Sequence, residues 1–362
     1  METETDGVAG VDGIQGTFGV AISPNGANVY VTGHSEGGIA TFTRDPNTSA
    51  LTFVEADEDD DSTVDGIEGA WGVAVAPGGG HVYVAGDIDD AVATFTRNPT
   101  TGALSWVEQD KDEVSGVDGL NTATGVAISP GGENVYVTGC ADNAIATFAR
   151  NSTSGALTWV EQDKQGVGGV NGMSCARGVA MTADGEGVYV AAESSAAVAD
   201  FTRNPDGTLT YVERELEGVN GVDGLQGARD VAVAPDGGHV YTASTVDDTV
   251  MTFSRDAATN DLTPLAAARD GVGGVDGIDQ ANGVTVSPSN TSVYATGEAD
   301  DAVAVFAREG APPPPPPAER AVRAATLNAK KKAKKGKKAT LAFKATSSNG
   351  GSKSATASVK VR

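Results

Sequence analysis

The chain has 362 residues, of which 48 are glycine and 5% are aromatic, and its formal net charge is −24. It contains no run of 18 apolar residues, which excludes a membrane-spanning helix, and its two cysteines can form neither a disulfide framework nor a four-thiolate zinc site. Residues 1–317 carry 48 acidic side chains against 12 basic ones, and because so negative a body repels nucleic acid, no nucleic-acid partner is expected there.

A dipeptide of Asp or Asn followed by Gly marks an internal repeat. Its first residue recurs at intervals of 52 or 53 residues, at Asp12, Asp65, Asp118, Asn171, Asp223 and Asp276. Periods of 20–50 residues are typical of proteins in which each unit is one small supersecondary element. The sequence therefore predicts six units that begin near these positions within a domain of residues 1–309.

Each unit contains four short apolar segments separated by turn residues. In the first unit they are residues 19–23, 28–31, 39–43 and 51–54, all rich in β-branched, aromatic or small residues. No unit leaves room for a helix of about ten residues. Four antiparallel strands in every unit predict an all-β fold, a β-propeller of four-stranded blades.

Three bulky side chains recur once in every unit: a Tyr in the second segment, and a Phe and a following Arg in the third. A side chain present in every blade is expected to fill the layer between blades, so these residues are interpreted as scaffold. They are Tyr30, 83, 136, 189, 241 and 294, Phe42, 95, 148, 201, 253 and 306, and Arg44, 97, 150, 203, 255 and 308.

Two stretches resemble a known family. Residues 19–33, Gly-Val-Ala-Ile-Ser-Pro-Asn-Gly-Ala-Asn-Val-Tyr-Val-Thr-Gly, are similar to the YVTN-type repeat, and residues 89–104 extend the similarity to lactonase-like bacterial propellers. The resemblance covers residues 8–309. It implies the propeller fold, and for activity it implies either a lactone hydrolase of the 6-phosphogluconolactonase kind or a propeller without known chemistry.

The two ends of the repeat region bear on the number of blades. Residues 1–5 align with residues 160–164, the fourth segment of a unit, whereas the sixth unit stops after its third segment at Arg308. We therefore predict six blades, the last completed by residues near 1–5. The alternative is a truncated seven-bladed ring, as in the family lactonases, with a signal peptide and a further blade upstream.

Function is expected where the units differ, because shared residues are committed to packing. The position at the start of the first segment differs between units, and in a propeller it surrounds the mouth of the central channel. Arg can clamp a carboxylate or phosphate there, and an aromatic ring can stack on a sugar. The predicted ligand-binding residues are Phe18, Trp71, Thr124, Arg177, Arg229 and Asn282; the alternative is a tolerant loop position.

A lactone hydrolase needs one group that activates water and another that stabilises the developing oxyanion. The candidates on the channel side are His34, Arg177 and Arg229, with Glu193 or Glu298. The Pro-His pair that related lactonases carry at this entrance is absent from every unit. The sequence therefore favours a non-catalytic role.

One acidic loop has the ligand spacing of a calcium site. Ser62 stands where a calcium loop has Gly, and no flanking helices are expected. Calcium is the only cofactor that the sequence suggests, and a solvated acidic loop face, open to an unknown ligand or protein, is the alternative. The candidate ligands are Asp57, Asp59, Asp61, Thr63 through its carbonyl, Asp65 and Glu68.

Cys140 and Cys175 lie in turns of adjacent units and on the same face. They are predicted to form a disulfide, and two free thiols are the alternative. A bridge would indicate an oxidising compartment. We therefore predict an extracellular or cell-surface protein, although the sequence shows no signal peptide.

The C-terminal region differs sharply in composition. Residues 310–317 include six prolines and predict a stiff polyproline linker, and residues 318–362 hold 13 basic side chains. This tail is expected to be a small basic β-rich module, a truncated Ig-like module or a disordered segment. Its charge suits an anionic cell-wall polymer.

Three functions follow from the sequence. The favoured one is an exported or cell-surface propeller that binds a ligand or partner without catalysis. The second is a lactonase-type hydrolase acting on a sugar lactone, and the third is a calcium-stabilised surface adhesin.

Overall fold

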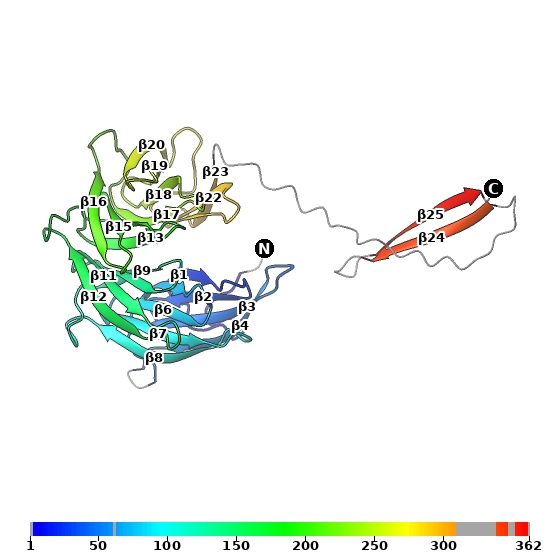
Figure 1. The fold of residues 1–362 in the computed structure, drawn as a ribbon, viewed down its shortest axis with the longest axis horizontal. Coiled ribbons are helices and arrows are strands. Elements are labelled where there is room, and N and C mark those ends of the chain that lie inside the picture. The colour runs from blue at the N-terminus through cyan, green and yellow to red at the C-terminus, as the bar shows by residue number, and fades with distance from the viewer. Residues whose placement is uncertain (1–2, 61–62, 309–337, 347–351, 361–362) are drawn as a thin grey trace. The chain divides into compact units, whose positions relative to one another are not determined.

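In residues 3–60 and 63–308, six antiparallel sheets follow one another along the chain, five of four strands and a sixth of three. The structure is a computed structural model that describes residues 3–60, 63–308, 338–346 and 352–360. Each sheet is one blade, numbered 1 to 6 in chain order, and the fold is the predicted all-β six-bladed propeller (Figure 1). The described residues include no helix that could cross a membrane.

Every blade is a meander in which consecutive strands pair. The first strands are β1 (Thr17–Ile22), β5 (Ala70–Val75), β9 (Ala123–Ile128), β13 (Ala176–Met181), β17 (Ala228–Val233) and β21 (Ala281–Val286). The second strands are β2 (Asn28–Gly33), β6 (His81–Gly86), β10 (Asn134–Gly139), β14 (Gly187–Ala192), β18 (His239–Ser244) and β22 (Ser292–Gly297). The third strands are β3 (Gly38–Arg44), β7 (Ala91–Arg97), β11 (Ala144–Arg150), β15 (Ala197–Arg203), β19 (Thr249–Arg255) and β23 (Ala302–Ala307). The fourth strands are β4 (Leu51–Glu58), β8 (Leu104–Lys111), β12 (Leu157–Lys164), β16 (Leu209–Leu216) and β20 (Leu262–Arg269).

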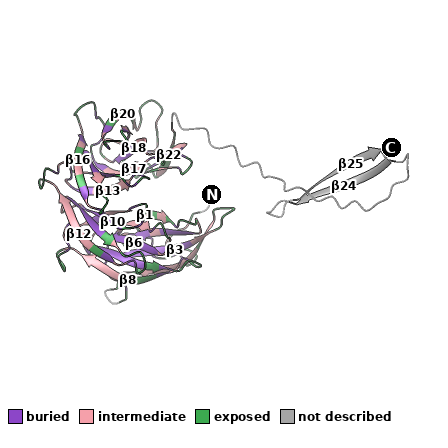
Figure 2. Ribbon diagram, viewed as in Figure 1, coloured by how far each residue is buried: buried purple, intermediate pink, exposed green. Residues whose placement is uncertain are grey.

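The core lies between blades rather than at one centre. The middle strands are covered on both faces, and every residue of β6 and of β10 is buried (Figure 2). The repeated Tyr and Phe side chains of blades 1 to 5 fill this layer, and Tyr83 and Phe95 are 0% exposed. Small residues let the first strands approach one another, since a Cβ atom on Gly72 would collide with the carbonyl oxygen of Thr124 in the next blade.

The sixth blade corrects one prediction. Among the described residues its sheet contains β21, β22 and β23. Residues 3–5 belong to no strand and residues 1–2 lie outside the described residues, so the prediction that residues near 1–5 complete the blade as a fourth strand is wrong for the part that the structure describes. The first strands of consecutive blades pack together from β1 to β21, whereas no comparable contact joins β21 to β1 in the described part of the chain. In the described residues, the outer faces of blades 1 and 6 therefore do not pack closely against each other.

Apolar side chains at these two faces are more exposed than their equivalents elsewhere. Val303 on blade 6 is 63% exposed, whereas Val92 at the same place in blade 2 is 0% exposed. Val20 on blade 1 is 65% exposed. A neighbouring blade covers these positions inside the arc, and nothing described here covers them at its ends.

The C-terminal unit is described by itself. It contains one antiparallel hairpin, β24 (Lys338–Thr346) paired with β25 (Ser352–Lys360). The predicted polyproline linker and most of the lysine run lie outside the described residues.

Candidate functional site at the channel mouth

Four of the six predicted channel residues meet in one cluster, and a fifth, Asn282, is connected to it through Glu298. Phe18 of β1 and Trp71 of β5 stack with ring centroids 4.0 Å apart. The Cζ atoms of Arg177 and Arg229 lie 4.8 and 5.3 Å from the centroid of the Trp71 ring. Arg229 also lies 5.8 Å from the Phe18 ring, so blades 1, 2, 4 and 5 all reach this point. We call these four side chains the aromatic–arginine cluster.

Two glutamates from the turns after the second strands hold the arginines. Glu193 accepts a hydrogen bond from Arg177 Nε, and Glu298 Oε2 lies 3.7 Å from Arg229 Nη1. Asn282 of blade 6 donates from Nδ2 to the same Glu298 oxygen at 3.0 Å. Five blades thus contribute side chains to one polar and aromatic assembly.

Thr124, the remaining predicted residue, does not join the cluster. It is 0% exposed, and its hydroxyl lies 3.2 Å from the Ala176 carbonyl oxygen and 3.2 Å from Thr138 Oγ1. Because these groups accept hydrogen bonds, the small Thr124 side chain points into the contact between blades and not into the channel.

His34 lies beside the cluster and has a carboxylate partner. Its Nε2 atom is 3.1 Å from Asp87 Oδ1, and its ring makes edge contacts with Phe18 at 5.4 Å and with Trp71 at 5.6 Å. Asp87 occupies in blade 2 the same turn position that His34 occupies in blade 1. The sequence supplied His34, Arg177 and Arg229 as catalytic candidates, and the structure places all three around the same aromatic pair.

Burial governs the electrostatics of this cluster. It raises the pKa of Asp87, and the adjacent His34 and Arg177 oppose that shift. It lowers the pKa of Arg229, with repulsion from Arg177 as the second cause. Within the described residues, Arg229 Nε is buried and has no hydrogen-bond partner. An unpaired buried donor costs about 1–3 kcal/mol, so this N–H favours an incoming oxygen acceptor.

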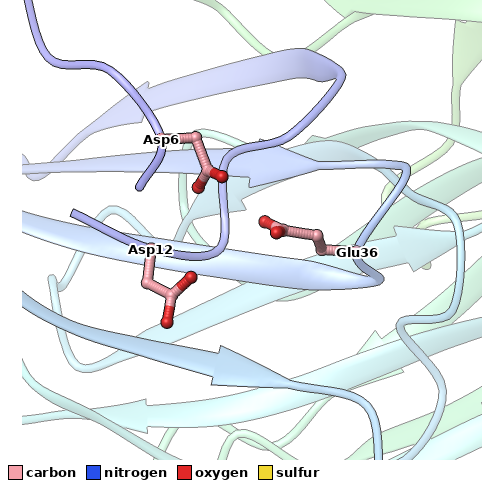
Figure 3. A group of neighbouring side chains, drawn as sticks. All are labelled: Asp6, Asp12 and Glu36. Carbon is pink, nitrogen blue, oxygen red and sulfur yellow. The ribbon is translucent and has the colours of Figure 1, made fainter. Parts of the chain in front are cut away.

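The acidic loops gather into separate clusters on individual blades. In blade 1, carboxylate oxygens of Asp6, Asp12 and Glu36 lie within 4.8 Å of one another, and the three side chains face a common space (Figure 3). Equivalent groups occur in blades 2, 3 and 6, formed by Asp59, Asp65 and Asp89, by Asp112, Asp118 and Asp142, and by Asp270, Asp276 and Asp300.

The predicted calcium loop is divided between different surroundings. Asp59 and Asp65 come together with Asp89, which the linear spacing did not include. Lys111 Nζ lies 3.4 Å from Asp89 Oδ1 and supplies a cation there. The other candidates lie elsewhere: Asp57 at the end of β4, Thr63 bonded to Asp60, and Glu68 with its backbone N–H on Asp89, while Asp61 is outside the described residues. Calcium binding stays a prediction.

A disulfide joins Cys140 and Cys175. The two residues lie in turns of blades 3 and 4 near the channel mouth, and their Cα atoms are 3.8 Å apart. That separation is shorter than the usual 4.4–6.8 Å. The bridge links the turn after β10 to the turn before β13, which carries Arg177.

These blades, with a polar and aromatic cluster at the channel mouth, define a β-propeller with a candidate binding site on its loop face. The chain belongs to the family described as "Lactonase, 7-bladed beta-propeller", whose model matches residues 3–117, 68–223 and 219–312. The six blades described here are one fewer than that description gives.

Solved structures share the fold at low sequence identity. A "putative 6-phosphogluconolactonase" from Bacteroides uniformis has a TM-score of 0.65 and 17% identity, with 81% of each chain covered. Another from Bacteroides fragilis has a TM-score of 0.64 and 19% identity, with 80% of each chain covered. The periplasmic gluconolactonase PpgL of Pseudomonas aeruginosa has a TM-score of 0.57 and 20% identity over 70% of each chain. No curated protein matches the chain significantly.

Proposed function

We propose that the protein is a non-catalytic, ligand-binding propeller that takes up a small carboxylate, of the aldonate type, at the aromatic–arginine cluster. The observation that carries the proposal is the guanidinium of Arg229. Its side chain is 19% exposed, lies over Trp71 and Phe18, and has an N–H without a partner among the described residues. A ligand carboxylate would satisfy that donor in a charge-assisted hydrogen bond.

The two arginines differ in availability. Arg177 is hydrogen-bonded to Glu193, whereas Glu298 stands 3.7 Å from Arg229 and its side chain is 55% exposed. A ligand carboxylate can therefore replace Glu298 at low cost, since an exposed ion pair contributes only about 0–1 kcal/mol. The Trp71 ring is covered by Phe18 and by guanidinium groups, so it supports Arg229 instead of stacking on a sugar.

Lactone hydrolysis is the second candidate, and the His34–Asp87 pair favours it. An imidazole held by a carboxylate can act as a general base, and the free Arg229 N–H can stabilise an oxyanion. The pocket of about 280 Å³ beside His34 is, however, lined by Glu36, Asp59 and Glu68. These carboxylates would repel a phosphorylated lactone. The Pro-His pair that related lactonases carry at this entrance is also absent, which is why we rank binding above hydrolysis.

We also propose export to an oxidising compartment. The Cys140–Cys175 disulfide supports this location, because such bridges persist in extracellular and periplasmic surroundings and are rare in reducing ones. Peptide mapping of unreduced protein isolated from its native source tests it, since two free thiols in that material would contradict export.

The binding test is calorimetry with sodium gluconate on the wild-type protein, Arg229→Ala and Arg44→Ala. Arg44 is the matched control, because its guanidinium bonds Gly26 and Ser49 within blade 1, away from the channel mouth. Loss of one charged hydrogen bond of about 1.5–3 kcal/mol predicts roughly 10- to 100-fold weaker binding for Arg229→Ala. Equal affinity in all three proteins, or no binding to the wild type, would overturn the proposal.

Hydrolysis is measured in parallel with gluconolactone. We expect no turnover above background. Turnover that His34→Ala and Asp87→Asn abolish, in variants with wild-type melting temperatures, would instead establish the lactonase function.

A further inference from the structure

We call the space between the fourth strand of a blade and the acidic turns beside it the groove of that blade. In blade 2, three side chains of β8 reach into this groove. Trp106 donates from Nε1 to the carbonyl oxygen of Asp65 at 2.9 Å, and Gln109 donates to the Asp65 carboxylate. Lys111 places its ammonium 3.4 Å from Asp89. The indole, the amide and the ammonium thus each contact a group of the acidic turns beside the fourth strand.

Blade 3 repeats the arrangement at the same positions. Trp159 donates to the Asp118 carbonyl oxygen at 3.1 Å, Gln162 donates to the Asp118 carboxylate, and Lys164 lies 2.9 Å from Asp142. The two blades therefore show independently which groups this groove accepts.

Blades 4 and 5 also supply a cation to the groove. Arg214 donates to Asn171 in blade 4, and in blade 5 Arg269 bonds Asp223 at 3.0 Å and Asp247 at 3.2 Å. In each of blades 2 to 5, a basic side chain of the fourth strand thus bonds an acidic or amide side chain of the neighbouring turns.

Blade 1 lacks the indole, the amide and the ammonium group that reach into the groove in blades 2 and 3. Phe53 faces Phe42 across the sheet as Trp106 faces Phe95, so the strand registers match. In that register Phe53 replaces Trp106, Ala56 replaces Gln109 and Glu58 replaces Lys111. Each change removes a hydrogen-bond donor, and the last also reverses a charge.

The result is an open acidic pocket of about 450 Å³. Its walls include the apolar side chains of Phe53, Ala56 and Val64, and its carboxylates include those of Asp12 and Glu58. Asp12 also belongs to the three-carboxylate cluster of blade 1 (Figure 3), so the acids that a lysine would neutralise are present without it.

The carboxylates around the pocket repel one another. Burial raises the pKa of Glu58, and Asp12 and Glu36 raise it further by repulsion.

We propose that this pocket binds an organic ammonium ion with an apolar or aromatic body. The ammonium would take the place that Lys111 has in blade 2, among the carboxylates, and the body would take the place of the indole against Phe53 and Ala56. The volume and the apolar wall fit such a molecule rather than a bare metal ion. The site lies on blade 1, apart from the aromatic–arginine cluster, and does not depend on the function proposed for that cluster.

The probe is tryptamine, which carries an indole and an ammonium in one molecule, and tryptophol is its neutral counterpart. By calorimetry we expect one tryptamine per chain, and affinity at least 10-fold weaker for tryptophol. The graft Phe53→Trp/Ala56→Gln/Glu58→Lys installs residues that blades 2 and 3 already carry, and it should abolish binding. Glu58→Gln provides a conservative second variant, with an expected several-fold loss.

The reverse graft Trp106→Phe/Gln109→Ala/Lys111→Glu opens the groove of blade 2, and it should raise the stoichiometry from one to two. Absence of tryptamine binding to the wild-type protein, or binding that the blade 1 graft leaves unchanged, would overturn the proposal. Binding of Ca²⁺ alone without tryptamine binding would also overturn it, in favour of a metal site.

Discussion

Arg97 of blade 2 donates from Nε to the hydroxyl oxygen of Tyr30 in blade 1 across 2.6 Å, and both side chains are buried. The same bond recurs at three further blade contacts, between Arg150 and Tyr83, Arg203 and Tyr136, and Arg308 and Tyr241. Four of the six repeated arginines thus bond the repeated tyrosine of the preceding blade, and we call this bond between blades the polar lock.

Replacing Arg97 with Ala should destabilise the propeller by about 2–3 kcal/mol, because Tyr30 and Asn28 lose a charged donor in a buried place. Arg44→Ala is the matched control, since Arg44 reaches no tyrosine of another blade in the described residues, and it should cost less than about 1 kcal/mol. Urea unfolding of both variants measures the difference. Equal midpoints would show that the lock contributes nothing to stability.

Reduction of the Cys140–Cys175 bridge should lower stability by about 3–4 kcal/mol, since a closed loop of 35 residues restricts the unfolded chain. Thermal unfolding with and without dithiothreitol measures the effect, and the Cys140→Ser/Cys175→Ser variant should match the reduced protein. Two thiols that react in denatured, unreduced protein would refute the bridge.

Asp200→Thr should stabilise the protein. Asp200 is 0% exposed, neither carboxylate oxygen has a partner in the described part of the chain, and blades 1 to 3 have Thr41, Thr94 and Thr147 at this place. Burial raises the pKa of Asp200 well above its ordinary value, with repulsion from Glu215 as the second cause. We expect a gain of about 1–3 kcal/mol near pH 8 and a smaller gain near pH 5.

The direction in which this stability gain changes with pH follows from proton linkage. A carboxyl whose pKa is raised in the folded state stabilises fully below its unfolded value, and this contribution is lost as the pH rises through its folded value. Thr147→Asp in blade 3 is the mirror control and should destabilise most at high pH. A gain from Asp200→Thr that does not change between pH 5 and pH 8 would contradict the reasoning.

Stability should also fall between about pH 4 and pH 7 in the wild-type protein. Burial first, and a neighbouring glutamate second, raise the pKa of Asp57 and of Asp163 to about 7, and that of Asp110 to about 6. Replacing all three with Asn should flatten the decline of the urea midpoint across this range. An unchanged decline would assign it to other groups.

Chelation tests the calcium hypothesis. We expect excess EDTA to leave the melting temperature unchanged, because the ammonium groups of Lys111 and Lys164 already lie against acidic clusters of blades 2 and 3. A lower melting temperature that added Ca²⁺ restores would show a metal bound to the folded state.

The repeat made the fold predictable from sequence, because each blade repeats the same strands, turns and packing residues. The aromatic–arginine cluster was predictable for the same reason, since Trp71, Arg177 and Arg229 break the repeat at one shared position. Thr124 broke it too, but whether a small hydroxyl side chain turns toward the channel depends on acceptors such as the Ala176 carbonyl oxygen, which only the structure shows.

Two features required the structure. The fourth strand of blade 6 could not be assigned, because alignment of residues 1–5 with a strand says nothing about which edge they meet. When the repeats are aligned with one another, the first unit differs from the second at Phe53, Ala56 and Glu58. The sequence could not show that these differences open a pocket, because that depends on what Trp106, Gln109 and Lys111 contact in blade 2.

Within the part of the chain that the structure describes, β21 and β1 make no close contact, so the free energy of unfolding should depend on a linear series of blade interfaces and not on a closed ring of them. In a closed ring every blade is held by two neighbours, whereas here blades 1 and 6 each have one neighbour in the described part of the chain. Stability in such an array is approximately a sum over nearest-neighbour interfaces, so opening begins at the ends, where a single interface must be broken. Amide hydrogens of β10 and β14 should then exchange more slowly than those of β2 and β22, a gradient of protection along the chain that a closed ring would not show.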